Sequence, residues 1–146
     1  MGGLRPVYGE RMTAETIIAR FDVTGWEPAD LPGLGLGGDP GDWLGAVVMR
    51  KTYTEGLVGE SVAHFISSGT EEGGRGYLAA ERISGRLDDG RTGSVTVHHG
   101  ALQHPSDASA FGYIVPGTGT GDFAEFSGRA RIEHDERGAF FVFELD

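Results

Sequence analysis

Apolar and polar residues alternate along most of the chain, which is the pattern of β-strands with one buried face. In residues 16–26, Ile17, Ala19, Phe21 and Val23 alternate with mostly polar side chains. Because successive side chains of a strand point to opposite faces, this spacing places the four apolar residues on one side. Similar patterns predict further strands in residues 46–56, 57–67, 76–87, 92–102, 111–115, 123–134 and 138–145.

Two longer segments interrupt the alternation, and both are predicted to be connections. Residues 26–43 contain three prolines and are bounded by Trp26 and Trp43. Residues 103–111 form a polar stretch between two predicted strands. Long connections without structure of their own are either binding loops or lids, or disordered segments, and the first of these segments is a candidate lid.

About eight antiparallel strands must pair their edges, so they either close into a barrel or pack as a sandwich. Consecutive hairpins favour the up-and-down barrel, whose interior holds packed side chains or one small ligand. The 26 glycines suit turns and bulges and are unfavourable in helices. The prediction is one all-β domain over residues 1–146, a small closed antiparallel β-barrel with little or no helix. Residues 1–12 are expected to be a loose tail, and a helical turn is considered only within residues 4–14.

The composition narrows the classes of partner. A net charge of −10 argues against nucleic-acid binding, which needs a basic surface to meet phosphates. No stretch approaches the ~20 apolar residues of a membrane helix, and the first residues hold no apolar run of signal-peptide length. The chain has no cysteine, which excludes disulfides and thiolate chemistry. We expect a cytoplasmic protein without nucleic-acid or membrane partners.

Two glycine-rich stretches match the residue spacing of the dinucleotide-binding motif but lack its structural context. Residues 33–38, GLGLGG, and residues 119–124, GTGDFA, fit the spacing of the motif. Neither follows a predicted strand and opens a helix, so the helix amino terminus that binds a pyrophosphate is missing. We interpret both as loops, with the second leading into a strand at Phe123, and we expect no cofactor.

Glu81 is the most informative polar residue, because it is in phase with the apolar positions Tyr77 and Ile83 of its strand. A buried carboxylate must be paired, hydrogen-bonded or protonated, and such groups serve as general acids or bases. The alternatives are a structural ion pair with an inward cation and a bulge that turns the side chain outward. The single lysine, Lys51, is in phase with Tyr53 and is the candidate cation for this ion pair. A Schiff-base lysine is the alternative role.

His99 is in phase with Val95 and Val97 and is predicted to point inward. If its strand pairs with the strand of Glu81, His99 is expected near Tyr77, and direct contact with Glu81 is left open. A core histidine held by hydrogen bonds is the alternative to a catalytic one. The other histidines, His64, His104 and His134, show no close spacing, so no metal is expected, although ligands from separate strands could converge.

Three segments resemble a bacterial family known as domain of unknown function 3224. They are residues 76–102 with the A-x-E-R-like motif and a histidine-bearing strand, residues 115–132 with the V-P-G-T-G-T-G segment, and the aromatic last strand. The resemblance covers residues 15–146 and implies a small eight-stranded barrel similar to that of allene oxide cyclase. Glu81, His99, Gly117, Gly119 and Gly121 match the family pattern. Relatives with this barrel include cofactor-free cyclases, whereas the long loop at residues 26–43 departs from the pattern.

The sequence therefore suggests a barrel that binds an apolar small molecule and isomerises or cyclises it without a cofactor or metal. The alternative is a non-catalytic ligand-binding or stress-associated protein. The aromatic Phe140, on the face opposite Phe141 and Phe143, is a candidate homodimer surface. The predicted catalytic residues are Glu81 and His99, and the predicted substrate-binding residues are Tyr53, Tyr77, Lys51, Trp26 and Trp43.

Overall fold

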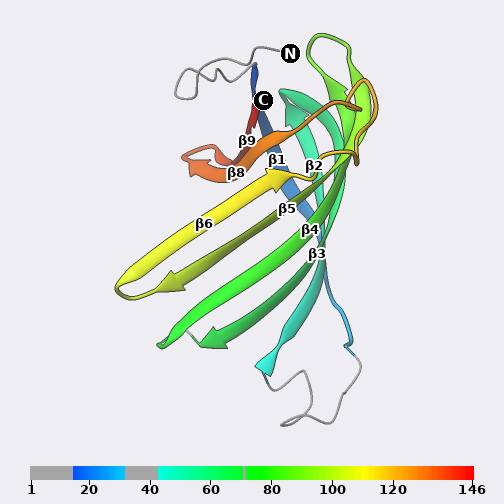
Figure 1. Cartoon of the computed structure of the whole chain (residues 1–146). Helices are drawn as coiled ribbons and strands as arrows, with labels where there is room; N and C mark the ends of the chain where they lie inside the picture. Colours follow the sequence, from blue (N-terminus) through cyan, green and yellow to red (C-terminus); the bar gives the residue numbers. More distant parts are fainter. Residues whose placement is uncertain (1–14, 32–42, 71) are drawn as a thin grey trace, which may run out of the picture.

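The computed structural model describes residues 15–31, 43–70 and 72–146, and these form nine β-strands (Figure 1). The predictions for the first residues and for most of the 26–43 loop lie outside the described residues. The strands are β1 (Glu15–Pro28), β2 (Gly45–Glu55), β3 (Leu57–Thr70), β4 (Gly74–Leu87), β5 (Thr92–His104), β6 (Asp107–Ile114), β7 (Thr120–Gly121), β8 (Gly128–Asp135) and β9 (Gly138–Leu145).

The strands close into an eight-stranded antiparallel barrel, as the sequence predicts. Their order is β4-β3-β2-β1-β9-β8-β6-β5, and β5 pairs with β4 to complete the ring. The short β7 adds only a two-residue pairing to β5. Most neighbours in the ring are consecutive in sequence, which is the up-and-down arrangement expected from the short turns.

The ring is complete over only part of its length. Strand β1 pairs with β9 from Glu15 to Phe21, and β6 pairs with β8 only at Tyr113 and Ile114. Past Phe21 in β1 and before Tyr113 in β6, no described strand lies between β1 and β6. The β3–β4 and β5–β6 hairpins extend beyond the complete ring (Figure 1). We call the ring up to these points the closed half and the remainder the open half.

The closed half is filled by apolar side chains in the predicted phase. Phe141, Phe143 and Leu145 of β9 are buried, and the space left among the side chains at this end is about 20 Å³. Outside the barrel, the Arg20 guanidinium lies 4.8 Å from the centre of the Phe140 ring. The main buried cluster comprises Ile17, Ala19, Phe21, Tyr53, Leu57, Ile83, Leu87, Val95, Val97, Ile114, Phe123, Ala130, Phe141, Phe143 and Leu145.

The prediction of a connection over residues 103–111 is wrong. Strand β5 continues to His104 and β6 begins at Asp107, so only two residues turn the hairpin. His104 pairs directly with Asp107, and the pairing continues without interruption into the barrel. Both faces of this hairpin end are exposed, so its side chains carry no apolar alternation to indicate a strand.

The glycine-rich segment is a connection, but Phe123 does not begin a strand. Its N–H donates to the Thr120 carbonyl in a turn, and β8 starts only at Gly128. The Phe123 side chain is buried in the closed half, which explains its apolar character without a strand. A Cβ atom at Gly119 would lie 1.8 Å from the Phe123 carbonyl oxygen, so only glycine fits there.

Candidate functional site

Glu81 lies inside the barrel with its side chain fully buried. Each of its two carboxylate oxygens accepts hydrogen bonds from two neighbouring side chains. Lys51 Nζ lies 3.0 Å and His99 Nε2 lies 2.8 Å from Oε1. Ser61 Oγ lies 2.5 Å and Tyr53 OH lies 3.1 Å from Oε2. We call these five residues the carboxylate cluster. Its four strands, β2 to β5, are neighbours in the barrel, and all five side chains follow the inward phase.

The strand register explains why His99 reaches Glu81. The turn after β4 is closed by the bond from the Leu87 N–H to the Arg91 carbonyl, so His99 pairs with Ala79. The prediction that His99 lies near Tyr77 is confirmed, because the Tyr77 hydroxyl lies 3.0 Å from His99 Nδ1. Glu81 pairs with Val97, and the two-residue diagonal on the inner face brings its carboxylate to His99.

The charge of Glu81 is stabilised where burial alone would remove it. Desolvation raises the pKa of this carboxyl, but the hydrogen bond from His99, the Lys51 ammonium and the hydrogen bond from Ser61 outweigh it and lower the pKa to about 2. Desolvation lowers the pKa of Lys51, and the attraction of Glu81 opposes that change. The pair is therefore a buried salt bridge whose partners depend on each other.

Aromatic rings cover the cluster. Lys51 Nζ lies 4.3 Å from the centre of the Phe21 ring and 5.0 Å from that of Phe141. The His99 imidazole meets Phe65 and Phe141 edge-on, with 5.7 Å between ring centres in both cases. Lys51 and His99 are each only 2% exposed, so neither offers a surface to a substrate. Lys51 forms the ion pair with Glu81, which was the favoured alternative to a Schiff base.

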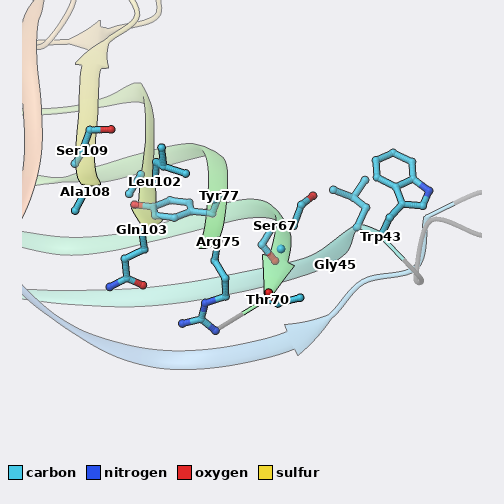
Figure 2. Close-up of a pocket in the computed structure, with 16 residues that line it drawn as sticks. Trp43, Gly45, Ser67, Thr70, Arg75, Tyr77, Leu102, Gln103, Ala108 and Ser109 are labelled. Atoms are coloured by element: carbon cyan, nitrogen blue, oxygen red, sulfur yellow. The ribbon is translucent and has the colours of Figure 1, made fainter. Parts of the chain in front are cut away.

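Tyr77 connects this buried cluster to the outside. Its hydroxyl lies 3.0 Å from His99 Nδ1, the ring nitrogen that does not face Glu81. Its ring packs on Phe65, with 5.1 Å between ring centres. The residue is half-buried and also lines a cavity in the open half (Figure 2). Tyr77 thus links that cavity by hydrogen bonds to Glu81.

The cavity is open and measures about 1050 Å³. We call it the cup. Figure 2 shows the Tyr77 ring between side chains of β5 and the end of β3, with Trp43 at the rim. None of the carboxylate cluster residues lines the cup. Its lining consists of Trp43, Leu44, Gly45, Ser67, Ser68, Gly69, Thr70, Arg75, Gly76, Tyr77, Ala101, Leu102, Gln103, Ala108, Ser109 and Ala110.

Trp26 lies on the inner face of the open half, although it does not line the cup. The register of β1 against β2 shifts between Val23 and Gly25, a β-bulge that reverses the alternation. Trp26 then pairs with Met49, which shares the inward phase of Lys51, so both side chains lie on the inner face. Trp26 is 61% exposed there, which is unusual for the inner side of a barrel.

The family model described as "Protein of unknown function (DUF3224)" matches residues 17–145. The chain belongs to this family. It is similar to the crystal structure of a DUF3224 protein of unknown function from Shewanella oneidensis MR-1, with 26% identity and a TM-score of 0.74. The match covers 90% of this chain and 96% of that one. No curated protein matches the chain.

Six of the seven predicted site residues of this DUF3224 chain fall into two places, and the seventh, Trp26, lies on the inner face outside the cup lining. Glu81, His99, Lys51 and Tyr53 meet in the carboxylate cluster, whereas Tyr77 and Trp43 line the cup. Sequence reasoning missed Ser61, although it carries the same signal as Glu81, a polar residue in phase with apolar ones. The catalytic and binding roles of these residues remain predictions.

Two further findings on the DUF3224 chain concern metal ions and membrane-spanning helices. Among the described residues, no group of three histidine, aspartate or glutamate side chains is placed to hold a metal ion. In the same part of the chain, no helix has the length and apolar character needed to cross a membrane.

Proposed function

We propose that the protein binds a small, largely apolar molecule in the cup. The observation that carries the proposal is the contrast between the two halves of the barrel. The closed half is packed, whereas the open half has a cavity of about 1050 Å³. Concave apolar sites with a few polar groups are the usual form of small-molecule sites.

The exposed side chains around the cup support this proposal. Trp43 is 55% and Leu102 is 46% exposed, and both line the cavity. Trp26 adds a further exposed ring on the inner face of the open half. Large apolar side chains gathered on a concave surface gain free energy when a ligand removes them from water. Arg75 and Gln103 supply polar groups at the same cavity.

The arrangement of Glu81 favours ligand binding over catalysis by Glu81 itself. A carboxylate that already accepts four hydrogen bonds and has no exposed atom has no position left for a substrate. In this proposal the carboxylate cluster fixes four of the five strands that line the cup, and contact with the ligand falls to Tyr77 and the cup lining.

The test is binding of Nile red, a neutral apolar dye whose fluorescence rises in apolar sites. Ala110→Trp should fill the cup, because Ala110 lines it and is exposed, and should weaken dye binding by about tenfold or more. Ile18→Trp adds the same ring on the outside of the closed half, where Ile18 is 51% exposed, and should leave binding unchanged. Dye that fails to bind, or binds both variants as well as the unaltered protein, contradicts the proposal. If the dye binds and Ala110→Trp weakens its binding, mass spectrometry of molecules that co-purify would identify the natural ligand.

A further inference from the structure

The hydrogen bonds around Glu81 have a fixed direction. An ionised carboxylate only accepts, so each of its four neighbours must donate. His99 therefore carries its proton on Nε2, where it meets Glu81 Oε1 at 2.8 Å. With Lys51 positive and Glu81 negative, a neutral His99 leaves the buried cluster without net charge, which is the arrangement that burial favours.

The direction continues to the cup. In a neutral imidazole protonated on Nε2, the Nδ1 atom is an acceptor, so the Tyr77 hydroxyl donates its proton to His99 across 3.0 Å. The Tyr77 oxygen then has lone pairs but no free proton to offer a ligand. The order Tyr77–His99–Glu81 matches the logic of a catalytic triad, in which a hydroxyl, a histidine and a carboxylate are joined in series.

We propose that Tyr77 is a general base for a weakly acidic apolar molecule in the cup, such as a carbon acid next to a carbonyl group, with His99 as its proton relay and Glu81 as the positioning carboxylate. This inference rests on the proposed function, because the molecule must first bind in the cup. It assigns proton abstraction to Tyr77, which the sequence predicted only as a substrate-binding residue.

The proton transfer balances without a cofactor. The C–H bond of the bound molecule breaks, its electron pair stays on the molecule as an enolate-type anion, and its proton moves to the Tyr77 oxygen. The original Tyr77 proton moves to His99 Nδ1, and the resulting imidazolium remains hydrogen-bonded to Glu81. The cluster gains one positive charge while the molecule gains one negative charge, so the two attract. Reversal of the relay returns a proton to the same or another carbon.

The chain contains a matched pair that should not act in this way. On the outer face of the barrel, Tyr113 OH lies 3.1 Å from His98 Nδ1, a contact similar to that of Tyr77 and His99. Tyr113 is 44% exposed, does not line the cup, and its histidine has no carboxylate partner among the contacts of the described residues. Tyr113→Phe therefore removes a comparable hydrogen bond at a site without the relay.

The test uses the full chain and 5-nitrobenzisoxazole, an apolar carbon acid. Removal of its ring proton by a base breaks the N–O bond and gives a coloured nitrophenolate, with no other reactant. The protein should accelerate this elimination above buffer, and Tyr77→Phe should reduce kcat by about 100-fold while Nile red affinity stays within about twofold. Tyr113→Phe should match the unaltered protein, and Ala110→Trp should lose the acceleration by filling the cup.

The outcomes separate the two proposals. If Nile red binds but the elimination is no faster than in buffer, or if Tyr77→Phe is as active as the unaltered protein, the general-base inference is overturned and the binding site stands. If Nile red does not bind, the proposed function fails. Should Tyr77→Phe fail to fold, Ala110→Trp still tests the inference, because full activity with a filled cup would place the reaction elsewhere.

Discussion

Removal of the Lys51 ammonium is expected to destabilise the protein strongly. Lys51→Met keeps a long unbranched side chain between the Phe21 and Phe141 rings but leaves the Glu81 carboxylate buried without its cation. Both partners are almost completely buried, at 2% and 0% exposure, so water cannot replace the lost charge. The remaining three donors to Glu81 offset part of the loss.

The magnitude follows from the geometry. Two unit charges at the observed 3.0 Å attract with roughly 5 kcal/mol at an effective dielectric constant of about 20. Loss of one partner of a buried pair typically costs about 3–5 kcal/mol, because the other charge stays desolvated. With three donors left, we expect the lower end, about 3 kcal/mol, which corresponds to a Tm lowered by roughly 10 °C in a chain of this size.

The assay is urea unfolding of four proteins at neutral pH: the unaltered chain, Lys51→Met, Glu81→Gln and the double variant. Each single variant should lose several kcal/mol, whereas the double variant should be less destabilised than the sum by about 2 kcal/mol. Arg131→Met is the control, because its ion pairs with Glu133 and Glu144 are solvent-accessible and should contribute less than about 1 kcal/mol.

Two results would refute this reasoning. Single variants within about 1 kcal/mol of the unaltered protein would show that Glu81 and Lys51 are not a desolvated pair. Strictly additive losses in the double variant would show that each residue acts through separate contacts.

Three other perturbations have defined outcomes in the same unfolding assay. Because the Glu81 pKa is lowered to about 2 in the folded state from an ordinary 4.5, its contribution is complete above about pH 5 and is lost as the pH falls to 2. The unaltered protein should thus lose about 3 kcal/mol more than the uncharged double variant over that interval, and parallel pH profiles would contradict the ionised state. Gly119→Ala should destabilise by more than about 1 kcal/mol, because its Cβ would lie 1.8 Å from a backbone oxygen, whereas Gly76→Ala, with its nearest contact at 3.5 Å, should change stability little. Phe141→Ala should cost about 3–5 kcal/mol because the side chain is fully buried, and an equal loss in Phe111→Ala, where the ring is 48% exposed, would argue against that cause.

Much of the barrel was predictable because strand alternation is a local property. The apolar residues of each predicted strand indicated which face is buried, and the consecutive hairpins favoured a closed barrel over a sandwich. The same phase placed Glu81, Lys51 and His99 inside, and all three are buried. A polar residue in an apolar phase is a strong signal, since burial without partners would be costly.

Other features depend on which strands meet and in what register, and those contacts join residues far apart in sequence. The extension of β5 and β6 over residues 103–111 is held by cross-strand pairing, although its side chains show no buried face. A bulge between Val23 and Gly25 turns Trp26 to the inner face, and no alternation pattern reveals where the extra residue falls.

The sequence by itself determined that the chain is an all-β barrel with a carboxylate, a lysine and a histidine facing inward. Only the tertiary structure decided that these groups meet in one cluster around a fully hydrogen-bonded Glu81 carboxylate. It also decided that the ring closes over part of its length and that Tyr77 connects the cluster to the cup. The physical reason is that alternation specifies the direction of a side chain, whereas distances between side chains are set by the register and length of strand pairing.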